Sequence, residues 1–273
     1  MTRHVVESPL RWGDMDAQAH VNNTAWVDHL QEARVDLLLR GPLAPMLDSG
    51  VLVVSHAVEF LGAVVADAEP LRIELWVAEV GAARFTLAYE LSHHDRLVGR
   101  ARTVATPYDL DTGTLRRLTA DERAELAALQ EDTEPLRPLA TGALDGAVEF
   151  PLTVRWSDLD SYGHVNNVMF YEYVQEARVA FLGGELATED GMWVVARQDM
   201  RYRRPLPHRL APYAVQIGVV GHGRTSITVA AEIVDPADGT VFAHADTVVV
   251  ATDRDGRPRP VDQSRVTRVM VNP

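Results

Sequence analysis

Apolar residues recur at helical spacing in two stretches of the chain that lie 144 residues apart. Each stretch places four of them at positions i, i+4, i+7 and i+11: Trp26, Leu30, Ala33 and Leu37 in the first, and Phe170, Val174, Ala177 and Phe181 in the second. This spacing predicts two helices that each bury one stripe. The predicted N-caps are Asn22 or Asn23 and Asn166 or Asn167, and the predicted stop signals are Gly41-Pro42 and Gly183-Gly184.

Beyond each helix the pattern changes to an alternation of apolar and polar residues, which is typical of half-buried strands. The first half alternates over residues 71–77, 85–91 and 98–106, and the second half over residues 215–219, 225–233 and 241–252. The short segments at residues 81–83, 93–96 and 235–239 have lengths that fit hairpin turns. A short strand is also expected over residues 3–11. One long helix and several antiparallel strands in each half predict the α+β fold class.

The polar segment before each predicted helix is itself repeated. Residues 11–23 read Arg-Trp-Gly-Asp-Met-Asp-Ala-Gln-Ala-His-Val-Asn-Asn, and residues 155–167 read Arg-Trp-Ser-Asp-Leu-Asp-Ser-Tyr-Gly-His-Val-Asn-Asn. Because the offset persists through the helices without a gap, a whole structural unit is duplicated. We predict an N-terminal unit over residues 1–131 that ends in a helix over residues 119–130. A Pro- and Gly-containing linker over residues 132–147 and a C-terminal unit over residues 148–273 follow.

Composition narrows the chemistry that the chain can use. The 273 residues include no cysteine, which removes disulfides, thiolate metal ligands and cysteine nucleophiles. All 26 basic side chains are Arg, which excludes a lysine Schiff base. The net charge is −13 and neither half is basic, so nucleic-acid binding is not expected. No apolar run is long enough to span a bilayer and no signal peptide is evident, so we expect a cytoplasmic protein. No metal or cofactor is expected.

The turn Asp158-Leu-Asp-Ser-Tyr-Gly-His-Val-Asn-Asn167, its copy in the first half, the long helix and the strands resemble the 4-hydroxybenzoyl-CoA thioesterase-like enzymes of the hotdog fold. The turn is also similar to that of plant acyl-carrier-protein thioesterases, which carry two hotdog units in one chain. The resemblance implies two tandem hotdog units, each a long helix wrapped by an antiparallel sheet, that pair as an intrachain pseudo-dimer. It also implies an acyl-CoA thioesterase of lipid metabolism that releases a free acid and CoA.

The resemblance further implies roles for six residues in the two turns. The catalytic carboxylate of the family aligns with Asp16 and Asp160, the histidine with His20 and His164, and the N–H groups that polarise the thioester carbonyl with the helix starts near Asn23 and Asn167. A carboxylate can serve as general base toward water or attack the carbonyl as nucleophile, and the sequence leaves both routes open. Plant enzymes carry Asn two residues after the catalytic Asp, where this chain has Gln18 and Tyr162.

Other residues of the repeat have structural interpretations. Asp14 and Asp158 are expected to cap or form the turn, and Trp12 and Trp156 are expected to belong to the core. Glu32 and Glu176 are expected on the polar side of the helices, where some thioesterases place a catalytic Glu. Arg34 and Arg178 are expected to pair with neighbours.

The second half has a run of arginines that the first half lacks. Coenzyme A carries phosphate groups, for which Arg is a suitable partner. The predicted phosphate-binding residues are Arg201, Arg203, Arg204 and Arg224, with Arg197 and Arg209 as further candidates. If the run is a strand, Arg201 and Arg203 share one face and Arg204 points to the other. The alternative is a solvated strand edge.

Two other functions remain open, and a third is disfavoured. The chain can be a non-catalytic acyl-CoA-binding module or sensor, and it can act on acyl carrier protein instead of CoA. A hydratase or dehydratase would need a His with an acidic residue in a different layout, which the sequence does not show. The sequence does not fix the acyl group, the equivalence of the two sites, or whether the pseudo-dimer assembles into a homo-oligomer.

Overall fold

The computed structural model describes residues 3–39, 41–139, 141–187 and 191–271. The chain divides into two units, residues 1–136 and residues 137–273. This division falls inside the segment 132–147 that the sequence suggests as a linker. The finer bounds of that linker stay a prediction.

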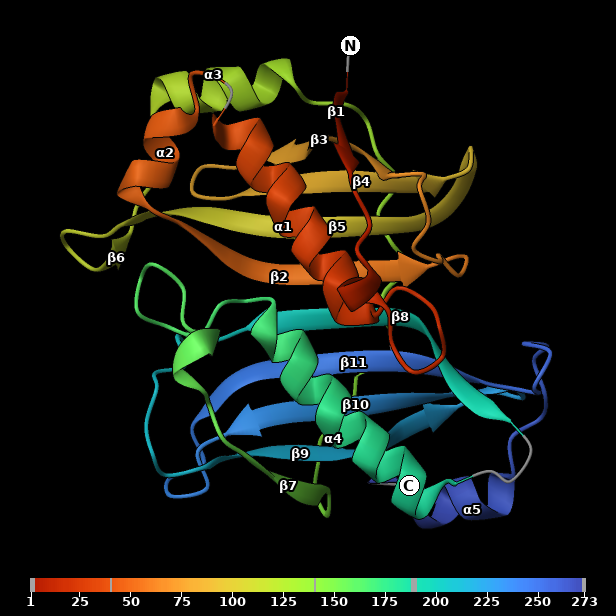
Figure 1. Cartoon of the computed structure of the whole chain (residues 1–273). Helices are drawn as coiled ribbons and strands as arrows, with labels where there is room; N and C mark the ends of the chain where they lie inside the picture. Colours follow the sequence, from red (N-terminus) through yellow and green to blue (C-terminus); the bar gives the residue numbers. More distant parts are fainter. Residues whose placement is uncertain (1–2, 40, 140, 188–190, 272–273) are drawn as a thin grey trace. The chain divides into compact units, whose positions relative to one another are not determined.

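Unit 1 forms a five-stranded antiparallel sheet with one long helix on it (Figure 1). In chain order its elements are β1 (His4–Ser8), η1 (Trp12–Asp14), α1 (Asn23–Leu39), α2 (Ala44–Ser49), β2 (Val51–Phe60), β3 (Leu71–Val80), β4 (Phe85–His93), β5 (Arg96–Asp109), β6 (Thr114–Leu115) and α3 (Ala120–Ala128). The strand order is β1-β3-β4-β5-β2, and β6 pairs only with the end of β5. The three strands predicted from alternation are confirmed as β3, β4 and β5.

Unit 2 repeats this arrangement. Its elements are β7 (Val148–Leu152), η2 (Trp156–Asp158), α4 (Met169–Glu185), β8 (Met192–Tyr202), β9 (Tyr213–His222), β10 (Ser226–Val234), β11 (Val241–Thr252) and α5 (Gln263–Arg268). The strand order β7-β9-β10-β11-β8 matches that of unit 1 strand for strand. None of the helices in the described part of the chain is long and apolar enough to cross a membrane.

Each long helix, α1 and α4, lies across its own sheet (Figure 1), and the predicted stripe of each helix is buried. All eight stripe residues are at most 7% exposed. The first residues of the two stripes, Trp26 and Phe170, contact equivalent aromatic side chains, since Trp26 meets Phe60 edge-on and Phe170 meets Tyr202 in the same way. The predicted helices and their buried faces are therefore confirmed.

The contact between the helix and the sheet uses side chains of different sizes in the two units. Gly99 of β5 lies directly under Trp26, and a Cβ at this position would overlap the indole ring. The residue 144 positions later is Ala243, and the helix residue above it is the smaller Phe170. A large ring over glycine and a smaller ring over alanine fill similar space, which keeps both helices at the same place on their sheets.

Both units end in a short helix followed by a bridge to the sheet. In unit 1 the predicted capping box is confirmed, because Thr119 and Glu122 bond each other's backbone N–H at the start of α3. After α3, Gln130 forms a parallel bridge with Val77 of β3, and after α5, Met270 does the same with Val219 of β9. The alternation and the repeat did not predict α5.

Three local predictions are wrong. The first strand ends at Ser8 rather than Arg11, and α4 continues through Gly183-Gly184 to Glu185. Trp12 and Trp156 do not belong to the core, because they are 85% and 77% exposed. Both tryptophans begin a 3-10 turn instead of lying in the preceding strand, and this turn directs their side chains to solvent.

Candidate functional site

The first aspartate of each repeated turn closes the 3-10 turn in front of it. An Oδ2 atom of Asp14 accepts a hydrogen bond from the backbone N–H of Arg11 at 2.7 Å, and Asp158 accepts one from Arg155 at 2.8 Å. The carbonyl oxygens of both aspartates also accept an N–H, from Asn22 and Asn166 respectively. The predicted structural role of the first aspartate is therefore confirmed in both copies.

The second aspartate also helps to build the turn. The N–H of Asp16 donates to the carbonyl of His20 at 2.8 Å, and Oδ1 of Asp16 accepts the N–H of Gln18 at 2.8 Å and that of His20 at 3.4 Å. Asp160 repeats these three bonds at the same distances with His164 and Tyr162. Both carboxylates are only half-buried. From the sequence, the second aspartate was expected to have a catalytic role only. The structure shows that its Oδ1 also accepts hydrogen bonds within the turn.

The two histidines contribute their backbone to this turn, through the carbonyls that accept the aspartate N–H groups. Among the described residues, the imidazoles of His20 and His164 form no hydrogen bond or ion pair. Both side chains are half-buried. Their predicted role beside the aspartates stays a prediction, since no bond joins either ring to a carboxylate.

The start of α1 provides backbone donors close to Asp16 in the chain. Oδ1 of Asn22 accepts the N–H of Thr24 at 2.9 Å, which makes Asn22 the N-cap. Within the described residues, the N–H groups of Asn23 and Ala25 donate to no acceptor. A helix N-terminus with unpaired N–H groups favours negative charge, and this is the property that an oxyanion-binding site requires.

The start of α4 differs in detail. The predicted N-cap of this helix, Asn166 or Asn167, is also wrong, because α4 begins at Met169 with Val168 as its N-cap. Oδ1 of Asn166 accepts the N–H of Val168 at 3.0 Å in the turn before the helix. The hydroxyl of Tyr202 donates to the carbonyl of Asn167 at 2.8 Å. The equivalent residue in unit 1 is Phe60, which has no hydroxyl to donate.

The predicted arginine patch is not a single group. Arg201 of β8 donates to Asp246 of β11 at 2.5 Å, while Arg203 and Arg204 follow the end of β8 and are exposed. The strand register pairs Arg201 with His244, near one end of the sheet. Arg224 precedes β10 at the other end, where Ser226 pairs with Val250. The further candidates are already paired, Arg197 with Asp199 and Arg209 with Asp235.

A buried polar cluster lies under α1 that the sequence did not reveal. Nδ1 of His29 is 2.7 Å from Oγ of Ser8, and Nε2 of His29 is 3.6 Å from Oδ2 of Asp14. Burial lowers the pKa of His29 even though Asp14 acts in the opposite direction. In unit 2 the equivalent residue is Tyr173, whose hydroxyl donates to Oδ2 of Asp158 at 2.6 Å. Burial and this carboxylate raise the pKa of Tyr173.

A second buried pair lies deeper under each helix. Arg178 was expected to pair with a neighbour that the sequence did not identify, and this neighbour is Gln198, whose Oε1 accepts from Nη1 of the arginine at 3.1 Å. Burial lowers the pKa of Arg178 to about 10. In unit 1 the strand position opposite Arg34 is His56, which bonds Oγ1 of Thr103 at 2.9 Å. Burial and Arg34 hold the pKa of His56 well below its ordinary value, so this imidazole is neutral.

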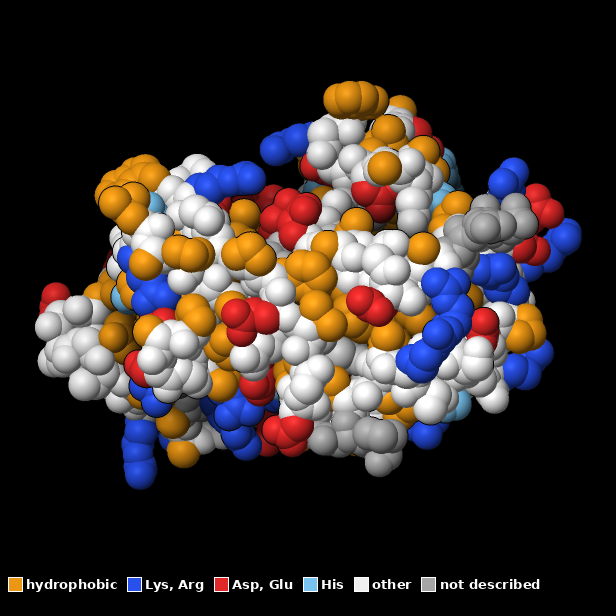
Figure 2. Space-filling model, turned by 90° about the horizontal axis from the view of Figure 1, so that it is seen from below, with side chains coloured by type: hydrophobic (Ala, Val, Ile, Leu, Met, Phe, Trp, Pro, Cys, Tyr) orange, Lys and Arg blue, Asp and Glu red, His pale blue; other side chains and the backbone are white. Residues whose placement is uncertain are grey.

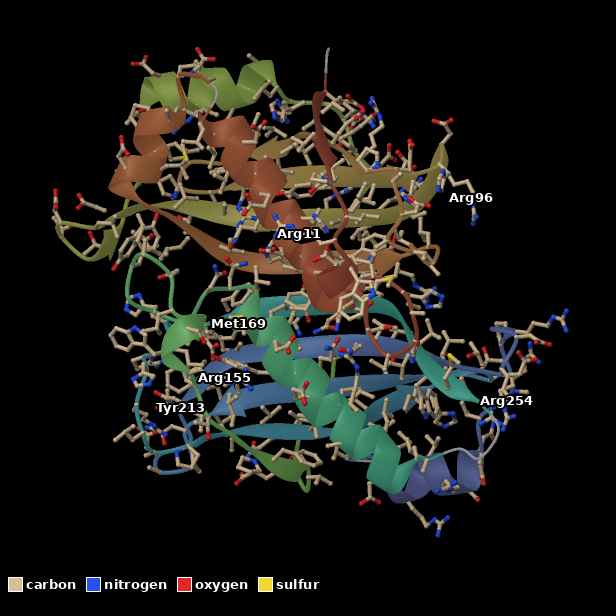
Figure 3. The ribbon with its side chains drawn as sticks, in the orientation of Figure 1. Arg11, Arg96, Arg155, Met169, Tyr213 and Arg254 are labelled. Carbon is tan, nitrogen blue, oxygen red and sulfur yellow. The ribbon has the colours of Figure 1, made fainter. Side chains whose placement is uncertain are left out.

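A groove of about 420 Å³ lies beside α4 in unit 2. Figure 3 labels Arg155 and Met169, two of its lining residues, near the start of that helix. Its apolar part includes Leu152 and Ala177, and its polar part includes Glu176. The outer surface carries charge of both signs, and Figure 2 shows acidic and basic side chains interspersed with hydrophobic ones on the face seen from below.

Comparison with known proteins supports the hotdog interpretation. The model of the "Thioesterase-like superfamily" matches residues 10–138 and again residues 154–269. No curated protein matches the chain. Among solved structures, the 12:0-ACP thioesterase from Umbellularia californica has a TM-score of 0.73 at 16% identity and covers 91% of this chain and 94% of its own.

Two bacterial structures are similar over the same extent. The putative oleoyl thioesterase from Lactobacillus plantarum has a TM-score of 0.74 at 13% identity and covers 93% of this chain and 98% of its own. The acyl-ACP thioesterase from Bacteroides thetaiotaomicron has a TM-score of 0.67 at 14% identity, with coverage of 90% and 96%. The predicted fold of two tandem hotdog units is therefore confirmed.

Proposed function

The chain belongs to the thioesterase-like superfamily, and we propose that it hydrolyses acyl-CoA thioesters to a free acid and CoA. The observation that carries this proposal is the turn of unit 1. It holds the half-buried carboxylate of Asp16 just ahead of a helix whose first N–H groups, at Asn23 and Ala25, lack acceptors in the described chain. A carboxylate and free N–H donors are the two elements that thioester hydrolysis requires.

The proposed mechanism assigns a separate task to each group. Oδ1 of Asp16 is committed to the N–H groups of the turn, so we assign the reacting role to Oδ2. That oxygen either takes a proton from the attacking water or attacks the carbonyl carbon itself, and the second route gives a mixed anhydride that water then cleaves. The N–H groups at the start of α1 stabilise the negative charge that forms on the carbonyl oxygen. The departing CoA thiolate needs little acid assistance, so His20 has a secondary role.

Asp160 and His164 form the equivalent proposed pair in unit 2, with the α4 start near Asn167 as donor. For substrate binding, we assign the CoA phosphates to the exposed Arg203 and Arg204, because Arg201 is bound to Asp246 and Arg224 lies at the far end of the sheet. Local cations are needed, since the net charge of −13 otherwise repels a phosphorylated ligand. The same net charge disfavours an acidic carrier protein as the substrate donor.

The test is a screen of acyl-CoA esters of increasing chain length, with a thiol-reactive dye that reports free CoA. Asp16→Asn, Asp160→Asn and the double variant are compared with the parent protein. Asparagine keeps an Oδ1 acceptor for the turn and replaces the reacting Oδ2 by an uncharged NH₂ group, so a loss of rate reports on chemistry. Asp48→Asn, at an exposed position on α2, is the matched control.

The expected result is thiol release by the parent protein and by the control, with little release by the double variant. A double variant as active as the parent would rule out the aspartates. Tight binding of acyl-CoA without thiol release would identify a binding module instead, and release from acyl carrier protein alone would change the substrate class.

A further inference from the structure

One group of imidazoles and a carboxylate in unit 1 lies outside the candidate site. Nε2 of His94 is 2.8 Å from Oδ2 of Asp67, and Nε2 of His93 is 3.3 Å from Oδ1 of the same carboxylate. The three ligand atoms lie within 4.8 Å of one another, and within the described residues this is the one cluster of that kind. It lies at the tip of the β4–β5 hairpin, which Arg96 marks in Figure 3.

The hairpin backbone fixes the two histidines in this arrangement. His93 is the last residue of β4 and is buried, whereas His94 and Asp95 form the two-residue turn with φ of 50° and 55°. Such a turn has positive φ at both central positions, which is the turn that matches the twist of a hairpin. Asp67 reaches the tip from the loop between β2 and β3. Two imidazoles on a rigid turn and a carboxylate from a separate loop therefore converge from two parts of the chain.

The spacing of the three ligand atoms is close to that around a small metal ion. Zinc binds His nitrogen and carboxylate oxygen at about 2.0–2.2 Å, so neighbouring ligand atoms of a tetrahedral site are about 3.4 Å apart. The observed separations of 2.8 and 3.3 Å need only small adjustments to reach this value. Nε2 of His93 also donates to the carbonyl oxygen of Glu69 at 3.2 Å. A metal ion bound to Nε2 replaces this hydrogen bond, with the ring proton then on Nδ1.

We propose that Asp67, His93 and His94 bind a divalent transition-metal ion, with zinc as the best match to two imidazoles and one carboxylate. Imidazole ligands suit zinc, copper and nickel and do not suit magnesium or calcium. Three protein ligands leave a fourth position for water. The side chains of His94 and Asp67 are 58% and 44% exposed, so the ion can enter without opening the fold.

Binding at this cluster has a structural consequence for the rest of unit 1. The ion joins the loop between β2 and β3 to the β4–β5 hairpin. The same loop contains Val64, whose carbonyl accepts the N–H of Val21 at 2.8 Å, next to His20 in the candidate turn. A bound metal therefore restrains a segment that holds the Asp16 turn in place. This proposal does not depend on thioesterase activity.

The test uses untagged, chelator-treated full-length protein and zinc chloride as the probe. Isothermal titration should show one strong site per chain, and the thermal midpoint of unit 1 should rise by several degrees. Asp67→Asn and His94→Ala alter exposed residues and should fold normally, yet each should weaken zinc binding by more than about 100-fold. His222→Ala, at an exposed position on β9, is the matched control and should bind zinc like the parent.

Two results would overturn the proposal. One is the absence of zinc binding by the parent protein, and the other is unchanged binding by both ligand variants. A separate readout, the shift of the His93 and His94 ring signals in the NMR spectrum when zinc is added, distinguishes binding at this cluster from binding elsewhere.

Discussion

In unit 1 the His29 imidazole lies between Ser8 and Asp14, whereas in unit 2 the equivalent Tyr173 donates directly to Asp158. Leu152 stands in place of Ser8, so the tyrosine needs no second partner. Both solutions hold the first aspartate of the turn against the helix. The comparison shows that the position of this aspartate is what the repeat retains, and that the group supporting it can change.

The edge strand and the helix are also joined differently. In unit 1, Nε2 of His4 on β1 is 2.8 Å from Oδ2 of Asp36 on α1. The equivalent residues of unit 2 are Val148 and Ala180, which form no polar contact of this kind, and Ala180 lines the groove of about 420 Å³. Replacing the His4–Asp36 pair by the short side chains of Val148 and Ala180 leaves space beside α4 that unit 1 uses for a hydrogen bond.

The largest expected difference between the units concerns activity. We predict that Asp16→Asn lowers kcat/KM more than Asp160→Asn does, and that the double variant loses about 10³-fold, within the range for loss of a general base or nucleophile. The reason is the helix start, since α1 begins at Asn23, whose N–H donates to no acceptor within the described residues, whereas α4 begins only at Met169, two residues beyond the equivalent position. Thiol release by the two variants measures this. Equal residual rates would contradict the predicted inequality.

The second largest expected difference between the units is the pH dependence of their stability. Burial opposes a charge on His244, but its hydrogen bonds to Asp246 and Glu232 prevail and raise its pKa to about 9. A folded pKa above the unfolded value of about 6.5 means that this stabilisation is complete below pH 6.5 and is lost as pH rises through about 9. The shift corresponds to about 3 kcal/mol. Unit 2 should therefore lose stability in alkali.

Unit 1 should respond in the opposite direction. Burial lowers the pKa of His56 and of His29 below the unfolded value. The unfolded chain then binds more protons below pH 6.5, so stability falls as pH drops below that point. Hydrogen exchange between pH 5 and 10, followed separately in peptides of each unit, tests both signs.

Two variants serve as controls for these pH effects. His56→Gln copies the residue of unit 2 and should reduce the acid sensitivity of unit 1. His244→Gln should reduce the alkaline loss of unit 2 at the cost of lower stability near neutral pH. Alkaline loss that persists in His244→Gln would show that another group is responsible.

A packing exchange should have the third largest effect. Gly99→Ala places a methyl group against the Trp26 ring, and overpacking of this kind costs about 1–3 kcal/mol. Adding Trp26→Phe should recover part of the loss, because the pair then matches Phe170 over Ala243. Urea denaturation of the two single variants and the double variant gives the coupling energy. Additive losses would show that the two residues do not compensate each other.

Local periodicity was enough to predict the two long helices and most strands, because the apolar residues of each buried face lie within one continuous segment of the chain. The gapless repeat also led from residues to the tandem fold. Periodicity could not predict the buried polar clusters, because their members come from different elements. The partners of His29, for example, come from β1 and from the 3-10 turn. The error at Trp12 and Trp156 has the same origin, because a three-residue turn reverses the direction that a strand would give these side chains.

The positions of several charged residues could not be predicted from alternation either. Arg201 and Arg224 are only 23 residues apart in the chain, yet the register of β8, β10 and β11 sends them to opposite ends of the sheet. Asp67 lies 27 residues before His94 and meets His93 and His94 only through a loop and a hairpin. Both arrangements depend on strand pairing, which alternation does not specify.

The smallest expected effect lies within the turn itself. Ala19 has φ of 59°, and the equivalent residue in unit 2 is Gly163, with φ of 76°. Glycine adopts this region freely, whereas an L-residue with a Cβ is strained there. We predict that Ala19→Gly stabilises unit 1 and that Gly163→Ala destabilises unit 2, each by about 0.5–1 kcal/mol after the entropy of glycine in the unfolded chain is included. Urea denaturation measures both values, and effects of the same sign would show that the two turns are not conformationally equivalent.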